Sequence, residues 1–480
     1  MHEITDPAMG GVVGAVTYDT PADVDAAVHK ARAAFADWSG QPPGVRADVL
    51  LKLADRMAAR AAEYAMVESG QTGKTLRLAT EFDVPGSIDN VTFFAGAARN
   101  LAGLASAEYD PDHTSVIRRE AIGVVGSIAP WNYPLQMAMW KALPAIAAGN
   151  TIVLKPAEIT PLTTLMFAED AHTAGIPAGV INIVNGLGSV VGEALVGHHD
   201  VDMVSFTGST PVGHRVMSLA AKRGARVHLE LGGKAPFVVF DDADLDAAIQ
   251  GAAAAALINT GQDCTAATRV YVQRPLYERF VDGVSDVFSS ISMGDPRDPS
   301  TDMGSLVSLA QRDRVSAFVD AAVLRGAKIT AGGVLPTGFL AEGAFYPATI
   351  VTGVTQDDPI VQEEIFGPVL VVLPFDSDDE GIALANDTPY GLAASAWTHD
   401  VYRAMRAQRE IRSGCVWIND HIPIVSEMPH GGVKGSGFGK DMSIYSLEEY
   451  TAMKHVSWDI TGVARKPWHR IIFADRIPAP

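Results

Sequence analysis

The sequence predicts an α/β protein in which two domains, each built on a parallel sheet, follow one another along the chain. The 480 residues are too many for a single hydrophobic core. From about residue 116 onward, short β-branched runs alternate with helical stretches, which is the pattern of β-α-β units in a parallel sheet. The alternation starts again after Lys234, so we expect the second domain to begin there.

The individual elements can be assigned in chain order. Residues 21–65 are rich in Ala, with apolar positions three and four residues apart, and predict helices. Residues 116–129 first alternate between apolar and polar side chains and then become apolar, as strands do. Further β-branched runs predict strands at 150–154, 180–184, 202–206, 235–240, 270–272, 369–373 and 415–419. No low-complexity linker is evident, so the domains are expected to pack together.

Composition and charge exclude several classes of function. A net charge of −19 argues against binding to a phosphate backbone, because nucleic-acid-binding proteins present basic surfaces. Two cysteines exclude a disulfide framework, and Cys415 lies in an apolar strand where we expect it to be inert. The N-terminus, Met1–Asp6, lacks the basic region followed by an apolar run that marks a secretory signal. No apolar stretch of the sequence is long enough to span a membrane. We therefore expect a cytoplasmic protein with no membrane or nucleic-acid partner and no bound metal.

Three residues are candidates for catalysis. Cys264 lies among glycine and small polar residues, which is typical of an approachable nucleophile. Glu230 precedes a glycine pair and could act as a general base that swings or reaches. Asn132 is held between prolines that stiffen the backbone, and a rigid amide is a suitable donor to an oxyanion. From the residues alone, a capping or turn role for Asn132 is the commoner one.

Two segments are candidates for cofactor binding. Gly208 and Ser209 directly follow an apolar strand, where a tight turn and a helix N-terminus would offer free amides and a positive dipole to a pyrophosphate. Lys155 and Glu158 follow another strand end, where ligands of open parallel sheets bind, and both can hydrogen-bond to ribose hydroxyls. The alternatives are an ordinary capped helix start and a solvated loop of mixed charge.

These motifs resemble those of the aldehyde dehydrogenase superfamily, from about Asp6 to His455. The segments that carry the resemblance are Pro130–Pro134, Leu229–Lys234, Gly261–Thr265, Gly431–Lys440 and Leu447–Thr451. The resemblance implies a Rossmann-type cofactor domain, a second α/β catalytic domain and a small oligomerisation element. The expected bounds are 1–101 and 122–232 for the NAD-binding domain, 233–440 for the catalytic domain, and 102–121 and 441–480 for the oligomerisation element and C-terminal tail.

The resemblance also implies a role for each candidate residue. The Cys264 thiolate would attack an aldehyde, Asn132 and the Cys264 backbone N–H would hold the oxyanion, and Glu230 would activate the water that hydrolyses the thioester. Contacts with NAD are implied for Trp131, Lys155, Glu158, Gly208, Ser209, Gly232, Glu364 and Phe366. A carboxylate at Glu158 would repel a 2′-phosphate, so NAD is expected to be preferred over NADP.

The residue that indicates a class of substrate is Asp263, which directly precedes the expected nucleophile. Together with Gln262–Ala267 and His421–Gly432, it resembles the γ-aminobutyraldehyde dehydrogenases. A carboxylate beside the thiol raises its pKa, which is a cost unless the carboxylate pairs with the ammonium of an aminoaldehyde such as 4-aminobutanal, the precursor of 4-aminobutanoate. Alternatively, Asp263 caps a helix from Cys264 to Thr268. A medium-chain aliphatic, aromatic or semialdehyde substrate is then equally plausible.

Two other functions remain open. A CoA-acylating dehydrogenase is disfavoured because such relatives generally lack the carboxylate base found at Glu230. A catalytically silent NAD-binding oligomer is disfavoured by the intact catalytic residues.

We also expect a homodimer or homotetramer in which residues 102–120 pair with the C-terminal region of a neighbour. The resemblance implies such an exchange of strands between subunits, and the apolar side chains of the tail, Ile471–Phe473, would be poorly placed in water. The chain is expected to lack the N-terminal strands of many relatives, and its tail from Ser457 extends past the usual end.

Overall fold

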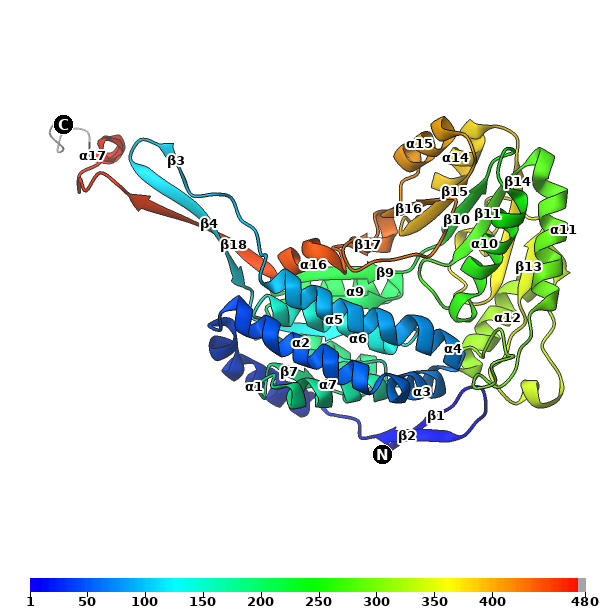
Figure 1. Cartoon of the computed structure of the whole chain (residues 1–480), viewed down its shortest axis with the longest axis horizontal. Coiled ribbons are helices and arrows are strands. Elements are labelled where there is room, and N and C mark those ends of the chain that lie inside the picture. The colour runs from blue at the N-terminus through cyan, green and yellow to red at the C-terminus, as the bar shows by residue number, and fades with distance from the viewer. Residues whose placement is uncertain (474–480) are drawn as a thin grey trace.

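The structure, a computed structural model, describes residues 1–473 of the chain. Two α/β units lie side by side, and a long arm extends from the first unit away from the second (Figure 1). Each unit has a mainly parallel central sheet, which confirms the predicted fold class. The end of the expected C-terminal tail, 474–480, lies outside the described residues.

The first unit is organised around a sheet with a reversal of strand order. The order is β17-β9-β8-β5-β6-β7, so the chain builds outward from β5 on one side and then continues with β8 on the other. The strands are β5 (Val124–Ile128), β6 (Thr151–Lys155), β7 (Ile181–Ile183), β8 (Met203–Gly208), β9 (Arg226–Leu231) and β17 (Gly437–Phe438). Ligands of open parallel sheets bind at the carboxyl ends of the strands beside such a reversal. Here those ends lead directly into the segments of Asn132 and Gly208.

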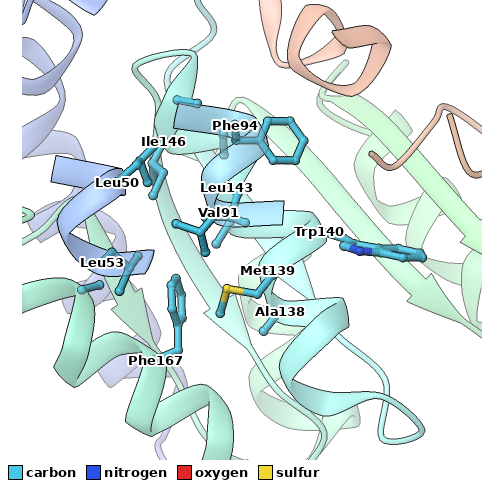
Figure 2. Packing of buried hydrophobic residues seen from close by; sticks show 14 of the residues in the cluster. Leu50, Leu53, Val91, Phe94, Ala138, Met139, Trp140, Leu143, Ile146 and Phe167 are labelled. Atoms are coloured by element: carbon cyan, nitrogen blue, oxygen red, sulfur yellow. The ribbon is translucent and has the colours of Figure 1, made fainter. Parts of the chain in front are cut away.

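Helices cover both faces of this sheet. Alternate residues of β6 face the two sides: Ile152 and Leu154 contribute to one core, and Val153 to the other. The helices are α1 (Pro21–Ser39), α2 (Pro43–Ala59), α3 (Ala61–Thr72), α4 (Leu76–Leu78), α5 (Val84–Ala98), α6 (Pro134–Ala147), α7 (Leu162–Ala174), α8 (Glu193–Gly197) and α9 (Thr210–Ala221). Figure 2 shows how residues of the larger core, such as Leu53, Val91 and Phe167, converge on α6.

Helix α6 positions one part of the site. Every residue from Pro134 to Ala147 is buried, because the helix lies among neighbouring helices and the sheet. A fully buried Leu or Met side chain contributes ~1.5–3 kcal/mol of transfer free energy, so a helix of this kind is firmly held. Asn132 lies two residues before α6 and is therefore fixed between a rigid strand and a rigid helix.

The second unit has the strand order β12-β13-β14-β11-β10-β15-β16. The strands are β10 (Ala235–Val239), β11 (Ala267–Gln273), β12 (Lys328–Ala331), β13 (Thr349–Thr352), β14 (Val369–Phe375), β15 (Ala393–Trp397) and β16 (Cys415–Ile418). The helices are α10 (Leu245–Leu257), α11 (Arg274–Ser290), α12 (Leu309–Leu324), α13 (Pro359–Gln362), α14 (Asp378–Asn386) and α15 (Val401–Glu410). Cys264 lies in the loop between α10 and the central strand β11.

The arm is an antiparallel sheet of β3 (Ala107–Asp110), β4 (His113–Ala121) and β18 (Thr451–Asp459), in the order β18-β4-β3. β18 pairs with β4 of the same chain, from Thr451 opposite Ala121 to Asp459 opposite His113. The expectation that this segment pairs with the C-terminal region of a neighbour is therefore wrong. The two strands satisfy each other's backbone hydrogen bonds within one chain.

Three further elements differ from the expected organisation. The N-terminus forms a hairpin of β1 (His2–Thr5) and β2 (Val12–Val16), which the sequence analysis did not anticipate. β17 pairs with β9, and α16 (Ser443–Glu449) packs on α5 and α6, so both lie with the first unit. The described part of the tail ends in α17 (Arg470–Phe473), at the tip of the arm (Figure 1). None of the helices in residues 1–473 is long and apolar enough to cross a membrane.

Candidate active site

A cavity of about 500 Å³ has walls from both units. It brings together nine of the residues singled out from the sequence: Trp131, Asn132, Gly208, Ser209, Gly232, Asp263, Cys264, Glu364 and Phe366. The three that are not on its wall are Lys155, Glu158 and Glu230. Residues from five separate parts of the chain thus meet in one place.

Cys264 is half-buried on the wall of this cavity. Burial raises the pKa of its thiol well above the usual range, and the nearby carboxylates of Asp263, Glu230 and Glu364 raise it further. The direction matches the effect predicted for Asp263. In this state the sulfur carries its proton at neutral pH, so nucleophilic attack requires prior loss of that proton.

Asn132 lies after β5 and is 5% exposed. Its side-chain Nδ2 donates a hydrogen bond of 3.1 Å to the backbone carbonyl of Gln262, two residues before Cys264. The amide therefore lies beside the segment that carries the thiol, where a developing oxyanion would form. This arrangement fits a preorganised oxyanion donor.

Glu230 is buried on β9, behind the cavity. Within residues 1–473 neither of its carboxyl oxygens has a hydrogen-bond partner, and Nε2 of His228 is 3.8 Å from Oε1. Burial, with a contribution from Asp441, raises the pKa of this carboxyl well above its usual range. To act on a group bound to Cys264, the carboxyl has to turn into the cavity. Gly431 leaves room for the carboxyl in its present position, off the cavity wall, because a Cβ at Gly431 would lie 2.3 Å from Oε1 of Glu230.

The cofactor end of the cavity begins where β8 meets α9. Ser209 precedes the first turn of α9 and its hydroxyl makes no capping bond, so the N-terminal amides are free for a ligand. The hydroxyl of Thr207 is buried without a partner among the described residues. A helix N-terminus beside an unpartnered hydroxyl fits a pyrophosphate group.

The opposite wall of this end is formed by Glu364 and two aromatic rings. Oε1 of Glu364 accepts a hydrogen bond of 3.0 Å from the backbone N–H of Gly233. A Cβ at Gly232 would lie 2.2 Å from Oε2 of Glu364, so only glycine permits this approach. The rings of Trp131 and Phe366 meet edge to face with centroids 5.3 Å apart. The carboxylate therefore offers a polar partner to a ribose, and the two aromatic rings offer partners to a flat ring.

Lys155 and Glu158 lie along the same sheet edge, at the end of β6. Nζ of Lys155 donates to the carbonyl of Pro156 at 2.8 Å and lies 3.4 Å from Oε2 of Glu158. Burial lowers the pKa of Lys155, although Glu158 opposes this. Their placement one strand away from the β5–β8 reversal is compatible with ribose binding, and that role stays a prediction.

Asp263 does not cap a helix, so that alternative is wrong. Ala267–Gln273 form strand β11, and no helix lies between Cys264 and that strand. Instead, Oδ1 of Asp263 accepts hydrogen bonds from the N–H and the hydroxyl of Thr265 at 2.6 and 2.7 Å, which closes a tight turn around Cys264. Oδ2 accepts a hydrogen bond of 2.7 Å from the hydroxyl of Tyr133.

No local sequence pattern assigned a role to the side chains at the far end of the cavity. They are Phe82, Tyr133, Trp140, Ile422, Ile424 and His430. Trp140 points away from the helical core, as Figure 2 shows, and its ring lies 4.8 Å from that of His430. Among residues 1–473, Arg314 is the only Arg or Lys on the cavity wall, and its guanidinium binds the carbonyls of Glu364 and Ile365 at the cofactor end.

His421 is a second missed residue. One ring nitrogen, Nε2, lies 2.7 Å from the carbonyl of Thr265, and Nδ1 lies 2.8 Å from the hydroxyl of Ser395. Burial lowers the pKa of His421 to about 4, so the ring is neutral and holds the loop after Cys264 by hydrogen bonding. The His421–Gly432 segment was noticed in the sequence for its resemblance, but no local pattern indicated this contact.

Comparisons with known proteins agree with this geometry. The sequence model of the family described as "Aldehyde dehydrogenase family" matches residues 1–456. A betaine aldehyde dehydrogenase of Mesorhizobium japonicum is 42% identical over 461 residues, covering 95% of this chain and 94% of the relative. A crystal structure of a putative aldehyde dehydrogenase from Burkholderia cenocepacia has a TM-score of 0.95 at 41% identity, covering 97% and 95% of the two chains.

A third comparison bears on the cofactor. The crystal structure of a betaine aldehyde dehydrogenase point mutant from Staphylococcus aureus, in complex with NAD⁺, has a TM-score of 0.94 at 37% identity. It covers 96% of this chain and 93% of that chain.

Proposed function

Because the chain belongs to the aldehyde dehydrogenase family and is an NAD-dependent aldehyde dehydrogenase, we propose that its substrate is an ω-aminoaldehyde, with 4-aminobutanal as the leading candidate. The observation that carries this proposal is the set of side chains at the far end of the cavity. There the carboxylate of Asp263 accepts a hydrogen bond from Tyr133, and Phe82 and Trp140 also line the cavity. Among residues 1–473, the one Arg or Lys on the cavity wall, Arg314, lies at the cofactor end, and Lys74, whose Nζ is 4.1 Å from the centroid of the Tyr133 ring, is off the wall and paired with Asp83.

This end of the cavity suits a cation. An ammonium group is attracted to aromatic faces by ~0.5–2 kcal/mol and gains a charge-assisted hydrogen bond from a carboxylate. A semialdehyde carboxylate would meet Asp263 without a basic partner, so it is disfavoured. A neutral aliphatic or aromatic aldehyde would leave the carboxylate without a ligand partner.

Betaine aldehyde is a second candidate. The Mesorhizobium japonicum and Staphylococcus aureus relatives are named for this substrate, which carries a quaternary ammonium group. Such a group needs aromatic faces and a nearby negative charge but cannot donate a hydrogen bond. Asp263 favours a primary ammonium, because a carboxylate oxygen has a second lone pair and can accept another hydrogen bond.

The residues of this chain support the following chemistry. The Cys264 thiolate attacks the aldehyde carbon, and the Asn132 amide with the Cys264 backbone N–H stabilises the oxyanion of the resulting thiohemiacetal. NAD held by the residues of the cofactor end would supply the hydride acceptor, and loss of a hydride from that carbon would leave a thioester on the sulfur. Glu230, turned into the cavity, takes a proton from the water that attacks the thioester, and the acid departs from the restored thiol.

The test is a comparison of matched aldehydes on the wild-type enzyme. 4-Aminobutanal, butanal, succinic semialdehyde and betaine aldehyde are compared by kcat/KM for NADH formation. We expect 4-aminobutanal to exceed butanal by about ten- to a hundredfold, since a charge-assisted hydrogen bond contributes ~1.5–3 kcal/mol. An equal or higher value for butanal or the semialdehyde would contradict the proposal, and a higher value for betaine aldehyde would select the second candidate.

A further inference from the structure

Three consecutive residues before Cys264 have left-handed backbone conformations. Their φ values are +50° at Asn259, +57° at Thr260 and +69° at Gly261. Such conformations are unfavourable for residues with a Cβ, above all for a β-branched residue such as Thr. A backbone of this kind persists only when surrounding contacts impose it, and it often marks a functional position.

The side chain of Asn259 makes two of the contacts that hold this turn. Its Nδ2 donates to the backbone carbonyl of Asn132 at 2.8 Å and to the backbone carbonyl of Gln262 at 3.1 Å. The same Gln262 carbonyl accepts the bond from Nδ2 of Asn132. All three residues are at most 5% exposed, so water does not compete for these groups.

The side-chain amide of Gln262 is itself held through both its nitrogen and its oxygen. Nε2 donates to the carbonyl of Asn259 at 3.1 Å, and Oε1 accepts from the N–H of Val307 at 2.9 Å. The Gln262 carbonyl therefore has a fixed position and two donors, which occupy both of its lone pairs. One of these donors is Asn259 and the other is the catalytic amide of Asn132.

We infer that Asn259 is a positioning residue for the oxyanion amide of Asn132. A primary amide has two N–H bonds, and one of them is anchored on the Gln262 carbonyl. The second is then directed to the cavity, where the oxyanion forms. If the amide turned over, its Oδ1 would face the Gln262 carbonyl, so two acceptors would oppose each other in a buried site.

Asn259 holds both backbone carbonyls on which the position of the Asn132 amide depends. It binds the Asn132 backbone carbonyl and the Gln262 carbonyl with the two hydrogens of one amide group, and so sets the distance between them. Its left-handed backbone is what aims the side chain back at both carbonyls. Asn is among the few residues other than Gly that adopt this conformation readily. The inference rests on the proposed role of Asn132 and not on the identity of the aldehyde.

Asn259→Gly tests the side chain independently of the backbone conformation. Glycine adopts the left-handed conformation readily, but it removes both N–H donors of the Asn259 amide. Thr260→Gly is the matched control: it lies in the same turn, but within residues 1–473 the one hydrogen bond of the Thr260 hydroxyl is to the carbonyl of Gly304, at 3.4 Å. We expect Asn259→Gly to lower kcat/KM by about ten- to a hundredfold, less than the ~10²–10³ of removing an oxyanion donor outright. Thr260→Gly should stay within about threefold of wild type, and NAD affinity should be unchanged in both.

A double-mutant cycle with Asn132→Ala distinguishes positioning from mere structural support. If Asn259 acts through Asn132, the Asn259→Gly factor shrinks to within about threefold in the Asn132→Ala background. The same factor in both backgrounds, or an equal loss in Thr260→Gly, would overturn the inference. If Asn132→Ala itself costs less than about tenfold, the proposed role of Asn132 is wrong instead. Asn259→Asp, which keeps the side-chain shape but cannot donate, serves as a second variant if the glycine variant does not fold, and it should show the same non-additivity.

Discussion

The hydroxyl of Tyr133 donates a hydrogen bond of 2.7 Å to Oδ2 of Asp263. This bond joins the residue after Asn132, the proposed oxyanion donor, to the residue before Cys264, the proposed nucleophile, across 130 positions of sequence. It also places a carboxylate at the aromatic end of the cavity and holds it in one orientation. The same carboxylate raises the pKa of the Cys264 thiol, so the substrate selectivity proposed for Asp263 would be linked to thiol reactivity.

Asp263→Asn should reduce selectivity for a cationic substrate without disrupting the turn. The amide oxygen can still accept from Thr265, and the amide N–H can donate to the Tyr133 oxygen, so the local hydrogen bonds are kept. We expect kcat/KM for 4-aminobutanal to fall about ten- to a hundredfold while that for butanal changes little. Steady-state NADH formation with both substrates checks this. Equal losses would mean that Asp263 acts only on the turn.

The same variant should make the thiol more reactive in the free enzyme. Removing the Asp263 charge lowers the raised pKa of Cys264, so the thiolate fraction at pH 8 increases. At a pH below the pKa, lowering the pKa by one unit increases the thiolate fraction about tenfold. We expect severalfold faster alkylation by iodoacetamide at pH 8. Cys415 is followed separately by peptide mass, since burial raises the pKa of its thiol to about 11. The exposed ion-pair variant Asp376→Asn is the control, and an unchanged rate in Asp263→Asn would show that the Asp263 charge does not raise the pKa of Cys264.

Glu158→Gln should alter cofactor choice. If the Glu158 carboxylate lies at the ribose, its loss weakens NAD binding and removes the repulsion of a 2′-phosphate, so the ratio of NAD to NADP affinity falls. Binding constants for both cofactors measure this, with the exposed Glu342→Gln as a control. Wild-type enzyme that uses NADP as well as NAD would remove the ribose role from Glu158.

The arm should be an oligomerisation surface. It projects from the body (Figure 1) and exposes large apolar side chains at Tyr109, Met453, Trp458 and Ile460, which an isolated chain would leave in water. We expect light scattering to give two or four times the 50.7 kDa chain mass. Charged substitutions at Met453 and Trp458 should lower it. A wild-type mass of one chain would contradict this expectation.

Local sequence patterns were sufficient for the parts of the site that lie at strand ends. Gly208 and Asn132 follow β-branched runs, and the carboxyl ends of parallel strands converge by topology alone. The bond between Tyr133 and Asp263, however, depends on how the two units pack. The retracted carboxyl of Glu230 depends on a side-chain rotation. Neither leaves a trace in periodicity or composition.

The arm and the hairpin show the same limit. Part of β4 falls within the strands predicted for residues 116–129, whereas no strand is predicted over β18. Even where a strand is recognised, its sequence does not say whether its partner belongs to the same chain or to another. The structure resolves this by pairing β4 with β18 within one chain. The short β1 and β2 lack a long alternating pattern and escape detection for that reason.

Trapping the acyl-enzyme tests the central claim most directly, because it involves the nucleophile, the base and the substrate together. In Glu230→Gln, thioester formation on Cys264 should proceed and its hydrolysis should be strongly slowed. Mixed with NAD and 4-aminobutanal, this variant should form about one NADH per chain in a burst and then nearly stop, with a 4-aminobutanoyl adduct at Cys264 found by peptide mass. Sustained wild-type turnover, or an adduct at a residue other than Cys264, would contradict the account.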